Sequence, residues 1–255
     1  MIKSKKRVLH KMGGIILMMV LGSSFVGCNI TSDNDYKKAA LETLEERYGE
    51  EFDIKQLGGT FGALNDTKKL VCYPVSSPDK FFYVEVEKDL SEVHDNYINR
   101  IMEEKLNEML TPIAKELFGE EVKVQSYFAH KYNEYDSLDM NVVDFMNRND
   151  NCTYVLSIFV RGGENIDKSI EAEKISIFGQ KLLENNILST NSVSIWYTKD
   201  DEYNNVESKY YDIIFERSVA KYYLNADKIY NTAWFEIVDK KMINTKEDII
   251  NSFKY

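Results

Sequence analysis

The chain is poor in the residues that mark several protein classes. Its 255 residues include three Pro, three Cys and three His. With so few prolines and 44% hydrophobic residues, the composition is that of a globular protein and excludes a disordered or proline-rich chain. The cysteines contain no CxxC pair, so neither a zinc knuckle nor a thioredoxin-type site is expected.

The sequence also lacks the common catalytic and cofactor signatures. It contains no HExxH zinc motif, no GxSxG nucleophile elbow and no phosphate-binding GxxxxGK[ST] loop. The glycines of 58–62 lead into a turn rather than a helix, and the acidic run 200–202 lacks the oxygen spacing of a calcium loop. His94-Asp95 is either a general base or an ordinary surface pair. No catalytic residue, cofactor site or metal site is therefore predicted.

Basic residues are in deficit. The chain has 32 Lys and Arg against 42 Asp and Glu, which gives a formal charge of −10. A surface of this sign repels nucleic acid and anionic lipid headgroups, so a nucleic-acid partner is not expected.

The first residues have the layout of a secretory signal. A basic stretch, Lys3 to Lys11, precedes an apolar run over Gly13–Val26. That run has about fourteen residues, whereas a helix that spans a bilayer needs ~20. The sequence therefore indicates an export signal. It is a signal cleaved before a lipid-modified cysteine, an ordinary cleaved signal or an uncleaved anchor.

Phe25-Val26-Gly27-Cys28 resembles a bacterial lipobox, in which a small residue precedes the cysteine that receives the lipid. Phe25 departs from the pattern, which more often has Leu there. The resemblance implies a signal peptide at 1–27, lipidation of Cys28 and a polar tether over 28–34. The membrane would then be a partner through acyl chains such as palmitate, and the protein would lie on the outer face of the cell membrane. Cleavage removes five basic residues and no acidic one, which changes the charge from −10 to −15.

Two cysteines remain beyond Cys28, namely Cys72 and Cys152. In a protein outside the cell, where conditions are oxidising, these two cysteines can form a disulfide. Each also lies in an apolar run, so two buried free thiols are the favoured alternative.

Hydrophobic periodicity predicts that the mature chain opens with a helix and a three-stranded meander, followed by a longer helix. The first helix is expected to begin at Asp35 and end at Gly49, and the second to be capped by Ser91 and to end at Gly119. At Pro112 the second helix either kinks or gives way to a fresh helix capped by Thr111. The strands between them are expected at Phe52–Leu57, Lys69–Val75 and Phe81–Glu87.

The later part of the chain mixes both kinds of element. The expected strands are Val122–Phe128, Cys152–Val160, Ser192–Thr198, Lys209–Phe215 and Ala233–Val238, and the expected helices are Leu138–Met146, Ile166–Ile187 with Ile170 in its buried stripe, and one capped by Thr245. An acidic hairpin-like turn is expected at Asp200–Asn205. This order predicts an α+β fold with mostly antiparallel sheets. The expected fold has an N-terminal unit at 35–128 and a C-terminal unit at 138–255. The two are either related α+β halves or parts of one domain.

The segment Tyr36–Phe52 ends in Arg-Tyr-Gly-Glu-Glu-Phe after a tether and a helix. It resembles the start of many uncharacterised lipoproteins of Gram-positive bacteria. Pro74–Phe82 and Asp95-Asn96-Tyr97 resemble the same group. The resemblance implies an extracellular, membrane-anchored location and a fold, and it carries no functional residues.

Aromatic residues supply a candidate interaction surface. Tyr132 and Tyr135 lie in a loop rich in tyrosine and charge, and Tyr210-Tyr211 and Tyr222-Tyr223 form a second group that is either interface or core. We therefore expect a non-catalytic binding module with a protein or glycan partner at the cell surface. The alternatives are a cell-wall or extracellular hydrolase using unidentified carboxylates, and a solute-binding lipoprotein.

Overall fold

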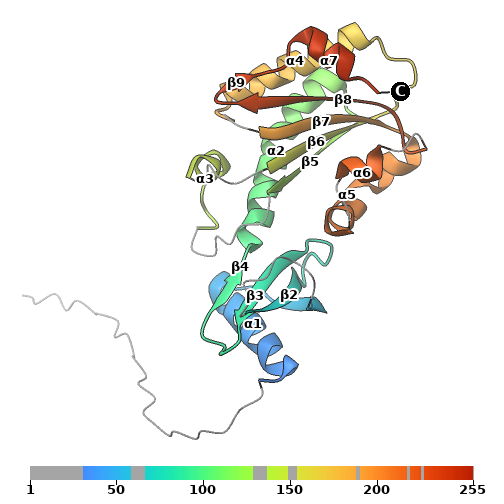
Figure 1. The fold of residues 1–255 in the computed structure, drawn as a ribbon. Coiled ribbons are helices and arrows are strands. Elements are labelled where there is room, and N and C mark those ends of the chain that lie inside the picture. The colour runs from blue at the N-terminus through green and yellow to red at the C-terminus, as the bar shows by residue number, and fades with distance from the viewer. Residues whose placement is uncertain are drawn as a thin grey trace, which may run out of the picture. The chain divides into compact units, whose positions relative to one another are not determined.

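The structure is a computed structural model (Figure 1). It describes residues 31–58, 67–128, 137–148, 154–187, 190–216, 219–224 and 227–254, with the backbone alone at 190–191 and 211–216. Residues from Thr31 onward form one compact unit. Its helices accompany two mostly antiparallel sheets, which confirms the predicted α+β class.

The first sheet is an antiparallel meander of four strands. These are β1 (Phe52–Leu57), β2 (Thr67–Pro74), β3 (Phe82–Glu87) and β4 (Val93–Asp95), paired in that order. The prediction of three strands missed β4, because Ser91 was expected to cap a helix. Ser91 instead donates its hydroxyl to Asp89, 2.6 Å away, and the helix begins after Asn96.

Helix α1 (Asp33–Tyr48) covers one face of this sheet. It begins two residues before the predicted start, because Ser32 is the N-cap and Asp35 completes a capping box with it. It ends as predicted at Gly49, whose φ of 71° lies in the left-handed region. The apolar side of α1, with Leu44 fully buried, makes a small core against the sheet.

The second sheet has five strands. They are β5 (Val122–Phe128), β6 (Tyr154–Arg161), β7 (Thr190–Thr198), β8 (Ile229–Val238) and β9 (Lys241–Met242), again paired in chain order. Only β6 and β7 are parallel among these strands. Helix α4 (Lys168–Glu184) connects them, since a parallel pair needs a crossover.

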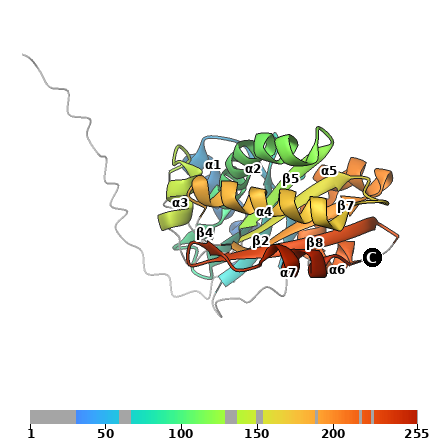
Figure 2. The same cartoon turned by 90° about the horizontal axis from the view of Figure 1, so that it is seen from above.

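Helices cover both faces of the second sheet. One face carries α4, α2 (Tyr97–Phe118), α3 (Val142–Arg148) and α7 (Lys246–Ser252) over the main core. The rings of Phe118 and Phe178 meet at 6.1 Å where α2 and α4 lie side by side (Figure 2). The other face carries α5 (Asp200–Glu216) and α6 (Val219–Tyr223) over a smaller core.

The predicted turn at Asp200–Asn205 and strand at Lys209–Phe215 are both wrong, because α5 runs through the whole segment. The three acidic residues of 200–202 occupy its first turn, where negative charge favours a helix. Tyr203, Val206 and Tyr210 are buried at helical spacing. The predicted burial of Ile170 is also wrong, since that residue of α4 is 57% exposed.

Helix α2 contributes to both main cores. Tyr97, at its first turn, packs with the first sheet, whereas Ile98 and Leu110 pack with the second. Strand β5, which the sequence placed in the unit 35–128, pairs instead with β6. Helix α2 lies in the predicted unit 35–128 and yet packs in the cores of both sheets. The described residues from Thr31 onward accordingly form one compact unit.

Gly163 provides a test of the packing between the β6–α4 turn and β7. Its φ is +102°, and a Cβ atom there would lie 2.7 Å from the Cβ of Tyr197. We expect Gly163→Ala to lower the free energy of unfolding by about 3 kcal/mol, from backbone strain and overpacking together. Gly119→Ala, at a φ of +97° in open space, should lower it by about 1 kcal/mol through strain alone. Urea denaturation followed by circular dichroism measures both, and equal losses would contradict the packing argument.

Candidate functional site

Several residues singled out by the sequence lie outside the described residues. They are Cys28, Tyr132, Tyr135, Cys152 and the glycines at 59–62. Lipidation and the tyrosine-rich interaction surface therefore stay predictions. None of the helices in the described part of the chain combines the length and apolarity needed to cross a bilayer.

His94 and Asp95 lie on strand β4 and not at the start of a helix as predicted, so their side chains point to opposite faces of the sheet. Asp95 is fully buried. Its Oδ1 accepts from the hydroxyl of Tyr48 at 2.7 Å and from the amide of Tyr97 at 3.0 Å, and its Oδ2 forms an ion pair with Arg47.

Burial raises the pKa of the Asp95 carboxyl, and the bonds from Tyr48 and Tyr97 and the charge of Arg47 oppose that rise. A raised carboxyl pKa is a feature of many catalytic acids. Both oxygens of Asp95 are occupied by partners within the fold, and neither reaches solvent. We infer that Asp95 ties α1 to β4 and to the start of α2, and that it is not a general base.

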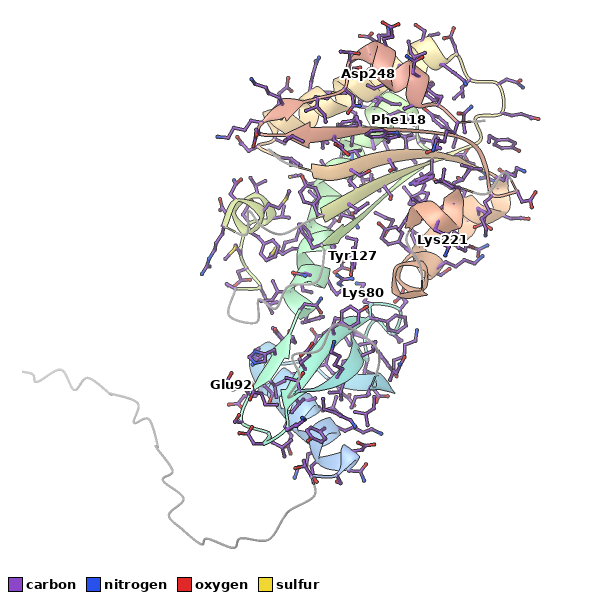
Figure 3. All side chains as sticks on the ribbon, viewed as in Figure 1. Lys80, Glu92, Phe118, Tyr127, Lys221 and Asp248 are labelled. Atoms are coloured by element: carbon purple, nitrogen blue, oxygen red, sulfur yellow. The ribbon has the colours of Figure 1, made fainter. Side chains whose placement is uncertain are left out.

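Potential metal ligands come together on the hairpin of β3 and β4. One ligand atom from each of Glu87, Glu92 and His94 lies within 4.8 Å of the other two. Glu92, which is labelled in Figure 3, directly precedes the first residue of β4. The sequence missed this group because it assigned Glu92 and His94 to a helix, whereas in a strand residues two apart share a face.

A buried ion pair on α2 fixes the end of β5. Arg100 and Glu103 are both nearly inaccessible, with Nη2 and Oε1 2.6 Å apart. The same Oε1 accepts the amide of Phe128 at 2.7 Å, and Ser126 donates its hydroxyl to the carbonyl of Glu103 at 3.1 Å. The guanidinium also stacks over Tyr127, labelled in Figure 3, at 4.9 Å. Strand β5 is therefore held against α2 at its C-terminal end.

Strand β5 is an edge of the second sheet among the strands that the structure describes. The amide of Arg161 on β6 donates to the carbonyl of Glu121 at 3.0 Å, so that carbonyl faces β6. Because backbone groups alternate along an antiparallel ladder, those of Val122, Val124 and Ser126 face away from β6. The amide of Phe128 agrees with this alternation, since it bonds to Glu103 and not to β6.

A groove of about 600 Å³ lies along this edge. Its walls are α2 on one side and α5 on the other, with β5 between them. The lining includes Asn107 and Glu108 of α2, Val122, Lys123 and Val124 of β5, and Tyr203 and Glu207 of α5. We call it the β5 groove. Its volume lies within the range of ordinary ligand sites.

Two lysines of the β5 groove have partners, whereas one buried oxygen atom has no hydrogen-bond partner among the described residues. Lys123 is tied to α5 by a 3.1 Å hydrogen bond to the Tyr203 carbonyl and a 3.4 Å ion pair with Glu207. Glu120 is paired with Lys115 at 3.0 Å. The Oδ1 atom of Asn107, by contrast, is buried without a hydrogen-bond partner among the described residues. A buried acceptor left unpaired is costly, so an incoming N–H donor would be favoured there.

The second aromatic group belongs largely to the core. Tyr210 and Tyr223 are fully buried against Phe159 and Trp196 on the α5 face of the sheet. Tyr222 is partly buried beside them, and the side chain of Tyr211 lies outside the described residues. For Tyr210 and Tyr223 the core alternative is confirmed.

Cys72 is a buried free thiol in β2. Burial raises the pKa of this thiol above its ordinary value, so it stays protonated and unreactive. This agrees with the favoured alternative of a buried thiol for Cys72.

Comparisons with known proteins give a fold and no activity. No protein-family model and no curated protein matches the chain. The chain is similar to a crystal structure of a DUF5037 family protein from Ruminococcus gnavus ATCC 29149, with a TM-score of 0.52 and 16% sequence identity. The likeness covers 85% of this chain and 98% of that one. At this identity it shows that the fold is shared.

The structural role of Asp95 can be tested through Arg47. We expect Arg47→Met to lower the free energy of unfolding by about 3 kcal/mol, because it leaves a buried carboxylate without its cation. Lys38→Met is the matched control, since Lys38 and Glu42 form an exposed pair 3.7 Å apart whose loss should cost about 0.5 kcal/mol or less. Urea denaturation measures both variants. A loss for Arg47→Met as small as the control would contradict the structural role.

Proposed function

We propose that the protein is a membrane-anchored extracytoplasmic lipoprotein that binds an extended peptide segment of a protein partner in the β5 groove. The observation that carries the binding proposal is the edge position of β5, among the strands that the structure describes, beside that groove. A row of main-chain donors and acceptors at a sheet edge is what an added strand recognises, and such pairing is a recurrent mode of peptide binding.

The shape of the groove supports an added strand. The backbone groups of Val122 and Val124 that face away from β6 lie on the groove between two helices that would flank an incoming chain, and Asn107 offers one more acceptor. Edge strands are often protected from pairing by a lysine. Here Lys123 is held toward α5 by Tyr203 and Glu207, so it leaves the edge accessible.

The N-terminal sequence supports attachment to a membrane. The apolar run and the lipobox at Cys28 support attachment by lipid, and at least two acyl chains give firm attachment. A tethered module works at high local concentration against partners on the same surface. A non-catalytic role agrees with the pairing of two of the groove carboxylates, Glu120 and Glu207, with lysines.

Peptide selection tests the groove. A phage-displayed library of random linear peptides is selected on the full chain in detergent, and enriched peptides are measured against two variants. Glu108→Trp fills an exposed position on the α2 wall and should weaken binding about tenfold or more. Glu116→Trp makes the same change at an exposed position of α2 outside the groove and should leave binding unchanged.

Hydrogen exchange locates the bound peptide. The amides of Val122 and Val124, which face away from β6, should exchange more slowly when the peptide binds than in the free chain, because a new strand accepts hydrogen bonds from them. Failure to enrich any peptide, or enriched peptides that bind both tryptophan variants equally, would contradict the proposal.

Fractionation tests the anchor. In its own host the protein should be found with the membrane, and Cys28→Ala should shift it to the soluble fraction because the acylated thiol is lost. Cys152→Ala changes a cysteine outside the lipobox and should stay with the membrane. Retention of Cys28→Ala in the membrane would overturn lipid anchoring and favour an uncleaved N-terminal anchor.

A further inference from the structure

The β3–β4 hairpin places three potential metal ligands on one face. Val86 pairs with Val93, and the amide of Glu87 donates to the carbonyl of Glu92 at 3.0 Å, so these two glutamates lie opposite each other. His94 follows Glu92 by two residues and therefore points to the same face. The backbone of the hairpin thus fixes all three side chains as neighbours.

The distances are near the ligand spacing of a tetrahedral transition-metal ion. The ligand atoms of Glu87, Glu92 and His94 all lie within 4.8 Å of one another. Nε2 of His94 and Oε2 of Glu92 are 3.4 Å apart. Tetrahedral zinc, with bonds of ~2.0–2.1 Å to nitrogen and oxygen, places its ligand atoms roughly 3.3 Å apart. The separation of these two atoms is therefore close to one edge of a zinc tetrahedron, and the ligand atom of Glu87 lies within 4.8 Å of both.

We propose that Glu87, Glu92 and His94 bind a divalent transition-metal ion of the zinc type. The imidazole favours such an ion over Mg²⁺ and Ca²⁺, which prefer oxygen ligands alone. Two carboxylates neutralise the charge of the ion, and the negative formal charge of the chain raises the local concentration of cations. Three protein ligands leave one coordination position for water or for a group of a partner.

The position of the site gives the ion a structural consequence. The hairpin contacts the beginning of α1, where the hydroxyls of Thr31 and Tyr36 donate to the carbonyl of Lys88 at 3.4 and 3.2 Å. An ion bridging Glu87 to Glu92 and His94 joins β3 to β4 next to that contact. Because it binds the folded hairpin and not an unfolded one, it stabilises the fold in proportion to its occupancy.

Calorimetric titration of the full chain with ZnCl₂ tests the site. After treatment with a chelator, the wild-type protein should bind one more zinc ion than the His94→Ala variant. The same ion should be lost in a Glu87→Gln/Glu92→Gln variant, which keeps the histidine and changes side chains that reach solvent. Zinc should also raise the melting temperature of the wild type more than that of either variant. MgCl₂ at the same concentration should not compete.

Glu184→Gln is the matched control, because it removes an exposed carboxylate from the end of α4, far from the hairpin in the chain. It should bind zinc as the wild type does. Any cysteine ligand elsewhere in the chain is present in every variant and cancels in the comparison. Equal zinc binding by the wild type and both site variants, or no zinc binding by the wild type, would overturn the proposal. The outcome is independent of peptide binding in the β5 groove.

Discussion

The structure depends on one buried ion pair, between Arg100 and Glu103 on α2. Two charges removed from water are costly unless each finds further partners. Glu103 accepts from both Arg100 and the amide of Phe128, and its carbonyl accepts from Ser126. These bonds fix the register of β5 against α2. The first turn of α2 packs in the core of the other sheet, so the helix that carries this pair contacts both sheets.

The accessible part of the β5 edge follows from this arrangement. Glu103 satisfies the last amide of the strand, and Ser126 is fully buried against α2, so the C-terminal end of the edge is closed. The groove between α2 and α5 lies along the other end, at Val122 to Val124. The buried charges close one end of the β5 edge, so an added strand can pair only over a short stretch. This limits both the register of a bound peptide and pairing with unrelated strands.

Local signals predicted most of the elements. The strands at 52–57 and 122–128 match their predicted bounds, and Thr245 caps α7 with Asp248 as expected. The misses occurred where two periodicities compete. The segment 200–216 carries turn-like acids followed by apolar residues at mixed spacing, and packing of Tyr203, Val206 and Tyr210 on the sheet selects the helix. Residues 93–95 are too few for a pattern and become a strand only by pairing with β3.

The candidate sites were less predictable than the fold. The β5 groove is lined by α2, β5 and α5, and α5 is distant in sequence from the other two. The edge position of β5 depends on strand pairing, which residue type alone does not reveal. The hairpin ligands are ordinary surface residues until strand pairing places them together. The N-terminal lipobox, by contrast, is a contiguous motif and can be recognised directly from the sequence.

Site-specific photo-crosslinking of the lipidated protein in its own host tests peptide binding most directly. A crosslinking amino acid is placed at Glu108, on the α2 wall of the groove, and in a second strain at Glu116, on the same helix outside it. If a peptide binds along β5, crosslinks from Glu108 concentrate on one short stretch of one protein partner, and this product is absent from Glu116. The same scattered products from both positions would contradict peptide binding at the edge of β5.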